Sequence, residues 1–188
     1  SKAKGCKVWD LDNKKYFDMC IMGIGTNTLG YGNKEVDEAV FKAIKKGNMS
    51  TLNCPEEVKL AEKLIEINPW AEMVRFARSG GEANSIAIRI ARAASLKDNV
   101  AICGYHGWHD WYLSANHNKE DNLSSHLLEG LNPKGVPENL KGTVFPFRYN
   151  NYEELVSIVK TKNIGVIKME VERNYPPKKN FLSKVRKL

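Results

Sequence analysis

Residues 73–104, MVRFARSGGEANSIAIRIARAASLKDNVAICG, contain the pattern that decides the fold. Met73–Ala77 predicts a strand, and the following segment has alanine and isoleucine at every third or fourth position, as on one face of a helix. Asn99–Gly104 then predicts a short buried strand. A strand, a tight loop, a helix and a second strand within about 30 residues form a βαβ unit with parallel strands. We therefore expect an α/β protein with a mainly parallel sheet and flanking helices.

The rest of the chain extends this pattern on both sides. Val8–Leu11 and Tyr16–Met19 flank Asp12-Asn13 and predict a β-hairpin with a tight turn. Ile164–Met169 predicts another buried strand. Apolar spacing and helix-start residues predict four further helices, over 36–47, from Pro55 to Pro69, after the capping pair Asn151 and Glu154, and from about Lys179.

Composition and charge exclude several classes of protein. The 188 residues are 42% hydrophobic and 27% charged, which is typical of a globular domain and not of a disordered or fibrous chain. No run approaches the ~20 apolar residues of a membrane span, and residues 1–5 lack the apolar stretch of a signal peptide, so we expect a cytoplasmic protein without membrane contact. Most of the net charge of +7 lies in residues 175–188, where no nucleic-acid motif accompanies it, so we expect no nucleic-acid partner.

Metal binding is not predicted either. The four cysteines lie far apart without a Cys-x-x-Cys pair, so neither a zinc ribbon nor a redox motif is indicated. His106 and His109 have the spacing of a metal-binding pair, but no third ligand accompanies them. We expect packing or hydrogen bonding for these two side chains.

The loop Arg78–Glu82 predicts an anion-binding site. It lies where a strand leads into a helix, so free backbone N–H groups and the positive end of the helix dipole converge there. Gly80 and Gly81 allow the backbone to approach a phosphate closely, and the Ser79 hydroxyl can add a donor. The alternative is a plain glycine turn, since neither a Walker loop nor a dinucleotide-binding fingerprint is present.

A second candidate site begins at the C-terminal end of the next strand, where open α/β sheets bind their ligands. Gly104–Tyr112 contains four aromatic side chains and two histidines, which suit stacking on a flat heterocycle; the alternative is core filling with a hydrogen-bonded histidine. Met169–Asn174 ends a later strand at the same edge, and Glu170 is the side chain that we expect to point into a cleft. Glu172 and Arg173 have the alternative interpretation of solvated loop charges.

A phosphate cradle, a ring-stacking segment and polar residues at one sheet edge are what a pyridoxal phosphate site requires. Several ordered motifs of this chain resemble the class III aminotransferases, with the strongest similarity to the glutamate-1-semialdehyde aminomutase branch. The motifs span nearly the whole chain: Val8–Asn13 with Tyr16–Asp18, Arg75-Phe76, Ser79–Asn84, Ala87–Ala93, Tyr105–Gly107, and Met169-Glu170 with Arg173-Asn174.

The resemblance implies the fold type I architecture of pyridoxal-phosphate-dependent transferases and a homodimer with the cofactor near the subunit interface. It also implies that residues 1–50 would join a small domain and that residues 51–188 would form the first part of the large cofactor-binding domain. The reaction would be the transfer or migration of an amino group on a small substrate of the amino-acid or amino-sugar type.

The resemblance assigns roles around the phosphate and the ring of this cofactor. The backbone N–H groups of Gly80 and Gly81 would hold the phosphate with Ser79 beside them, and many relatives have threonine where Gly81 stands. Tyr105 would stack on the pyridine ring, and His106 would shape the same pocket.

The resemblance assigns two further residues to the site. Glu170 would be the active-site glutamate, and it is followed here by Val171 where the family commonly has proline. Asn174 would lie near the cofactor.

Family enzymes also carry an aspartate that pairs with the pyridinium nitrogen and a lysine that forms the Schiff base, and the resemblance places both beyond Leu188. Lys168 is not expected to take the place of the Schiff-base lysine, because its neighbours Ile167 and Met169 suggest that it faces away from the pocket. We therefore expect this chain to be the N-terminal part of a family member and to be inactive alone. The alternative is a catalytically inactive, truncated module that binds pyridoxal phosphate or phosphate.

Overall fold

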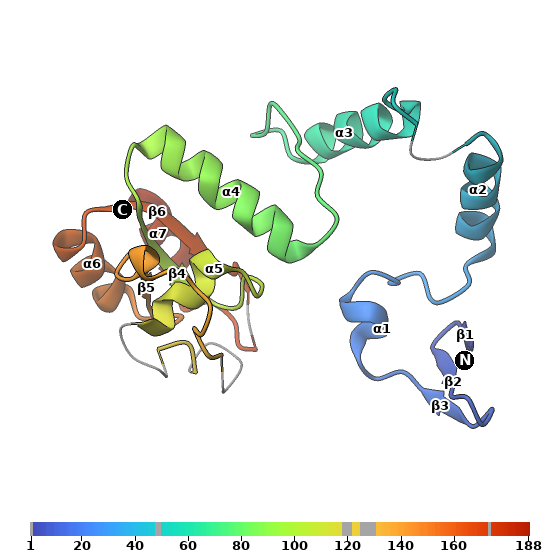
Figure 1. The fold of residues 1–188 in the computed structure, drawn as a ribbon, viewed down its shortest axis with the longest axis horizontal. Helices are drawn as coiled ribbons and strands as arrows, with labels where there is room; N and C mark the ends of the chain where they lie inside the picture. The colour runs from blue at the N-terminus through green and yellow to red at the C-terminus, as the bar shows by residue number, and fades with distance from the viewer. Residues whose placement is uncertain (1, 48–49, 118–121, 125–130, 173) are drawn as a thin grey trace. The chain divides into compact units, whose positions relative to one another are not determined.

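The computed structural model describes residues 2–47, 50–117, 122–124, 131–172 and 174–188. The chain divides into two compact units, residues 1–74 and 75–188, which Figure 1 colours from blue to turquoise and from green to red. No helix within these described ranges is long and apolar enough to cross a membrane. The predicted division after residue 50 concerns the domains of a whole protein, and it stays a prediction.

The first unit opens with an antiparallel three-stranded sheet in the order β1-β2-β3. The Oδ1 atom of Asp10 closes the turn between the second and third strands, because it accepts hydrogen bonds from the N–H groups of Asp12 at 3.0 Å and Lys14 at 2.9 Å. The predicted hairpin is confirmed, with shorter strands than expected. The strands are β1 (Lys2–Lys4), β2 (Lys7–Trp9) and β3 (Lys15–Phe17).

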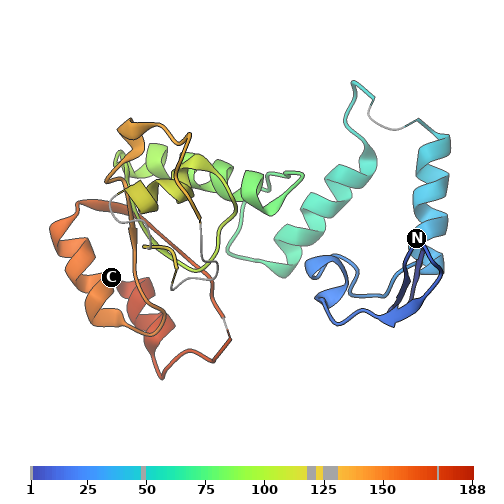
Figure 2. The same cartoon turned by 60° about the horizontal axis from the view of Figure 1, so that its bottom comes forward.

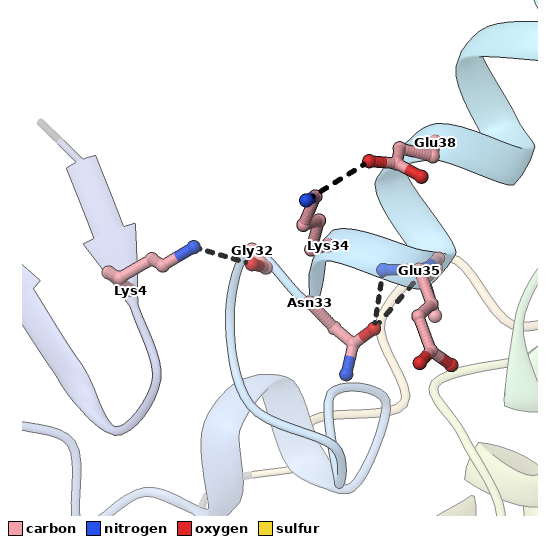
Figure 3. A network of polar contacts seen from close by, with 7 residues as sticks. Lys4, Gly32, Asn33, Lys34, Glu35 and Glu38 are labelled. Atoms are coloured by element: carbon pink, nitrogen blue, oxygen red, sulfur yellow. Dashed lines mark hydrogen bonds and ion pairs between the residues drawn. The ribbon is translucent and has the colours of Figure 1, made fainter.

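The second helix of this unit begins at an asparagine cap, which Figure 3 shows from close by. Asn33 Oδ1 accepts hydrogen bonds from the N–H groups of Glu35 and Val36 at 3.1 and 3.2 Å. Lys4 Nζ donates to the carbonyl oxygen of Gly32 at 2.9 Å, which links the sheet to the residue before the cap. A side-chain oxygen at this position satisfies N–H groups that have no partner within the helix.

The helices of the first unit follow the local signals of the sequence, but they bury nothing. The predicted helices near 36–47 and after Pro55 are confirmed, and both have acidic residues in the first turn, where the helix dipole favours them. No described residue of 1–74 is buried. The helices are α1 (Ile21–Ile24), α2 (Lys34–Lys45) and α3 (Pro55–Ile67).

The second unit contains a parallel three-stranded sheet in the order β5-β4-β6. The strands are β4 (Asn99–Cys103), β5 (Val144–Pro146) and β6 (Ile164–Met169). The helical segments are α4 (Gly80–Ser95), α5 (Asp110–Leu113), η1 (Ser114–His117), η2 (Glu138–Leu140), α6 (Tyr152–Thr161) and α7 (Phe181–Lys187). The predicted α/β class with a parallel sheet is confirmed.

The core of the second unit lies on both faces of this sheet, with α4 and α5 on one side and α6 and α7 on the other (Figure 2). Successive side chains of β4 point to opposite faces, as the period of a strand requires. Val100 and Ile102 pack in the cluster that contains Ile88 of α4, whereas Ala101 packs in the cluster that contains Leu155 of α6. The central strand is therefore buried on both faces.

The predicted strand at Met73–Ala77 is wrong for the described chain, because this segment forms no ladder with any of its strands. Alternating apolar residues favour an extended backbone, but a strand also needs a hydrogen-bonded neighbour. In this sheet β4 has β5 on one edge and β6 on the other. The parallel crossover that the structure does show runs from β5 through α6 to β6.

Candidate functional site

The N-terminus of α4 lies where the sequence predicts an anion-binding site. Ser79 caps the helix, and its Oγ atom accepts a hydrogen bond from the N–H group of Glu82 at 3.2 Å. The Glu82 carboxylate in turn accepts from the N–H group of Arg78 at 2.8 Å. Gly80 and Gly81 form the first turn, where backbone N–H groups have no acceptor within the helix. The Ser-x-x-Glu spacing of residues 79–82 is a capping-box signal that sequence reasoning missed.

Two glycines bring this helix start against the loop that follows β4. A Cβ atom on Gly107 would lie 2.6 Å from the Cα atom of Gly81, and one on Gly81 would lie 2.7 Å from the ring of His109. A threonine in place of Gly81 would therefore require the His109 ring to move. The loop Arg78–Glu82 and the aromatic segment, which the sequence predicts as two neighbouring sites, are in direct contact.

The aromatic segment divides between an exposed ring and a packed core. Tyr105 is 36% exposed, and its ring meets the edge of Tyr112 at a centroid distance of 5.9 Å. His106 is only 2% exposed, and its Nε2 atom lies 3.0 Å from the carbonyl oxygen of Cys103. Trp111 and Tyr112 are buried. Core filling thus holds for α5, whereas Tyr105 is partly exposed and its role in stacking stays a prediction.

Side chains of α5 join the two parts of the site. Trp111 Nε1 donates to Ser85 Oγ at 3.2 Å, and the Ser85 hydroxyl donates to the carbonyl oxygen of Gly81 at 3.0 Å. The Tyr112 hydroxyl donates to the carbonyl oxygen of Gly104 at 3.0 Å. Sequence reasoning did not single out Ser85, and its only signal was a polar residue one turn after the glycines on the same helix.

Glu170, the expected active-site glutamate, lies directly after β6 and is half-buried. Its Oε1 atom accepts a hydrogen bond from the N–H group of Tyr105 at 3.3 Å. A Cβ atom on Gly104 would lie 2.6 Å from the Glu170 carboxyl carbon, and Gly104 has a φ of +101°. The Glu170 carboxylate therefore holds the backbone of Tyr105 in place. At position 104 the positive φ and the nearby carboxylate favour glycine.

The expectation that Lys168 faces away from this region is wrong. Its Nζ atom lies 3.3 Å from His106 Nδ1. Ile167 and Met169 pack on the face of α6 and α7, so strand alternation turns Lys168 to the opposite face, toward His106. Burial lowers the pKa of Lys168, and the negative charge of Glu170 acts in the opposite direction.

Asn174 lies in a separate pocket, which the start of α4 and Tyr105 do not line. It is exposed and lines a pocket of about 600 Å³ together with Cys103, Tyr149 and Lys178. Arg173 lies outside the described residues. Across the described residues, no group of three or more histidine, cysteine, aspartate or glutamate side chains is placed to hold a metal ion.

Comparisons with known proteins identify the class. The family model of class-III aminotransferases matches residues 1–141. Glutamate-1-semialdehyde 2,1-aminomutase of Nitrosopumilus maritimus is 37% identical over 100% of this chain and 44% of its own length. The 3-aminobutyryl-CoA aminotransferase of Cloacimonas acidaminovorans is 32% identical over 99% of this chain and 43% of its own length.

A solved structure described as a transaminase with PLP bound superposes with a TM-score of 0.85 and 26% identity, over 100% of this chain and 44% of its own. The chain belongs to the class-III aminotransferase family. It spans less than half the length of the curated relatives it matches. The family and the fold predicted from its motifs are confirmed.

Proposed function

We propose that the protein containing this chain transfers or moves an amino group on a small amino-acid or amino-sugar-type substrate, with pyridoxal phosphate as cofactor. The observation that supports the proposal is the contact between the capped N-terminus of α4 and the loop bearing Tyr105, a partly exposed aromatic residue. A phosphate attached to a flat heterocycle needs both features together.

The residues at the start of α4 fit the phosphate of this cofactor. The N–H groups of Gly80 and Gly81 lie at the positive end of the helix dipole. No atom comes within 4 Å of a Cβ placed on Gly80, so the backbone is open to a ligand there. The Ser79 oxygen accepts from Glu82, which leaves its hydroxyl hydrogen available for a phosphate oxygen.

The residues after β4 fit the ring. Tyr105 presents a partly exposed ring for stacking, and the Tyr112 ring edge on one side and the Glu170 carboxylate on its N–H group hold it in place. His106 is buried, and we propose that its ring shapes the wall of the pocket.

Bound pyridoxal phosphate supplies an electron sink for bonds at the amino-bearing carbon of the substrate. The role of the described residues of this chain is to bind and orient the cofactor. The start of α4 takes up the phosphate charge, Tyr105 covers one ring face, and Glu170 holds the Tyr105 backbone by accepting its N–H hydrogen. We propose that Glu170 serves the reaction through this hold on Tyr105 and that Asn174 contributes from the neighbouring pocket.

The assembly and the remaining chemistry are part of the same proposal. We propose a cytoplasmic homodimer with the cofactor near the subunit interface. We also propose that the lysine that binds the cofactor covalently, and the aspartate that pairs with its ring nitrogen, lie outside residues 1–188. The family resemblance supports both points.

Borohydride reduction of the whole protein tests the proposal. We expect a pyridoxyl group on one lysine outside residues 1–188, located by peptide mass spectrometry. Two outcomes would contradict the proposal. One is a protein that contains no cofactor on isolation and takes up none when pyridoxal phosphate is added. The other is a label only on lysines within residues 1–188.

A binding measurement on the 188-residue chain tests the site itself. Pyridoxamine 5'-phosphate has no aldehyde and cannot form a Schiff base with lysine, so its binding reports the non-covalent pocket. We expect it to bind more tightly than pyridoxamine, and we expect Tyr105→Ala to weaken binding, whereas Tyr16→Ala in the first unit serves as the matched control. Equal affinity for the two compounds would count against the phosphate site.

A further inference from the structure

We propose that Lys168 is a positioning residue of this site, which holds the buried His106 ring neutral, with its hydrogen on Nε2 directed at the Cys103 carbonyl oxygen. The juxtaposition of the Lys168 amino group with His106 Nδ1 carries this inference. It rests on the proposed function only for its consequence in cofactor binding.

The hydrogen-bond partners of His106 determine which nitrogen carries the hydrogen. The carbonyl oxygen of Cys103, 3.0 Å from Nε2, can only accept, so Nε2 must donate. Nδ1 then has a lone pair, and the Lys168 amino group at 3.3 Å is a donor for it. Both ring nitrogens are satisfied in the neutral form of the ring.

A second proton on this ring would meet opposition. It would bring an Nδ1–H group against the Lys168 ammonium and place two positive charges in a buried site. The rings of Trp111 and Tyr112, at centroid distances of 6.3 and 5.9 Å from the His106 ring, are the neighbours from α5. Glu170, on the same side of β6, attracts the ammonium of Lys168 and so favours its charged form.

Holding His106 also holds the segment that presents Tyr105. Glu170 binds the Tyr105 N–H group from one direction, and Tyr112 binds the Gly104 carbonyl from another. His106, the next residue, is fixed through its side chain by Cys103 and Lys168. Loss of the Lys168 donor would remove one contact that fixes this ring, so the ring would gain other orientations.

Nitrogen-15 NMR of histidine-labelled 188-residue chain tests the inference, because the two ring nitrogens report hydrogen position and hydrogen bonding directly. In the wild type we expect a neutral His106 with the hydrogen on Nε2. Lys168→Arg should preserve this pattern. In Lys168→Met the Nδ1 resonance should move toward that of an imidazole without a donor, and in Lys168→Glu the ring should become doubly protonated.

Lys160→Glu is the matched control, because it makes the same charge change on the exposed surface of α6. It should leave the His106 resonances unchanged. The near-isosteric Lys168→Met decides the matter if the charge-reversed chain does not fold. Identical His106 nitrogen shifts in the wild type and Lys168→Met, with circular dichroism showing that both are folded, would overturn the inference.

A second readout connects the pair to the cofactor. We expect Lys168→Met to weaken pyridoxamine 5'-phosphate binding by about three- to tenfold, the effect of one lost hydrogen bond, and Lys168→Arg to restore it. Unchanged affinity in Lys168→Met would overturn the positioning role. If the wild type does not bind this compound, the proposed function fails, while the nitrogen shifts still decide what Lys168 does to His106.

Discussion

Two amphipathic helices of this chain, one in each unit, have different environments. In α4, Ile88 is 2% exposed because it packs on the parallel sheet, whereas Val40 on the apolar face of α2 is 51% exposed. Both helices begin at a residue whose side chain caps the first turn. Capping and apolar spacing are therefore sufficient to form a helix in either unit, but burial occurs only where a sheet face is available to receive the apolar side.

The difference has an energetic consequence. Residues 75–188 bury two apolar clusters, one on each face of the sheet, and the described part of residues 1–74 buries none. Since burial is the dominant favourable contribution to folding, most of the unfolding free energy of the chain should come from the second unit. The following predictions compare matched positions in the two units.

The largest difference is expected for phenylalanine. Phe147 is 1% exposed and Phe41 is 58% exposed. Phe147→Ala should lower the free energy of unfolding by about 3–5 kcal/mol through lost burial and a cavity, whereas Phe41→Ala should change it by no more than about 0.5 kcal/mol. Urea unfolding followed by tryptophan fluorescence measures both, because each unit contains tryptophan. Equal losses would mean that α2 has a packed partner.

A smaller difference is expected for two glycines of similar backbone conformation. Gly107 has a φ of +96° and Gly47 a φ of +85°, but only at Gly107 would a Cβ atom clash with backbone. Gly107→Ala should cost about 1–3 kcal/mol more than Gly47→Ala, because the start of α4 and the loop after β4 would have to separate. The same urea experiment checks this, and a Gly107→Ala chain as stable as Gly47→Ala would show that this close approach does not exist.

The helix caps should differ in which measurement they affect. Ser79→Ala removes the acceptor for Glu82 N–H and should lower the unfolding free energy of the second unit by about 1 kcal/mol. Asn33→Ala removes an equivalent acceptor in α2, where no packed core transmits the loss. In Asn33→Ala, amide hydrogen exchange should become faster in α2 only, and the midpoint of the urea transition should not change. A shift of that transition by Asn33→Ala would contradict the comparison.

The smallest effect concerns pH. The Tyr31 hydroxyl, 2.7 Å from Asp18, lowers the pKa of that partly exposed carboxyl, helped by the N–H group of Cys20. Because the folded pKa lies below the unfolded value of about 3.9, the stabilisation is present above that value and is lost as pH falls through the folded pKa. Tyr31→Phe should raise the Asp18 pKa toward the ordinary value in an NMR titration. An unchanged titration would show that the hydroxyl contributes nothing.

Local features are predictable from the sequence because their causes are local. Ile164–Met169 forms β6 as expected, and the cap on Asn151 Oδ1, which accepts from the Glu154 N–H group at 3.2 Å, opens α6. The Glu154 carboxylate, however, binds Arg148 and not the cap residue. The ordered motifs likewise identify the class III aminotransferases from residue order alone. The individual site residues Ser79, Gly80, Gly81, Tyr105, His106, Glu170 and Asn174 stay predictions.

Two expectations fail because they depend on neighbours from distant parts of the chain. Met73–Ala77 has the residue types of a strand, but pairing requires an adjacent strand, and residue type does not specify one. The expected direction of Lys168 rests on Ile167 and Met169 alone. Those two residues do share a face, but the opposite face is the one that carries His106.

By itself the amino-acid sequence determined the family, the parallel-sheet class, the two loops that bear the candidate site, and the helices α2, α3, α4, α6 and α7. The helices depend on residue spacing and on short-range hydrogen bonds, and the family is identified by the order of motifs along the chain. Only the tertiary structure decided that β4 lies between β5 and β6, that Gly81 touches Gly107, and that a lysine of β6 meets a histidine after β4. The order of parallel strands depends on how separate crossovers pack together, and no local pattern in the sequence encodes that packing.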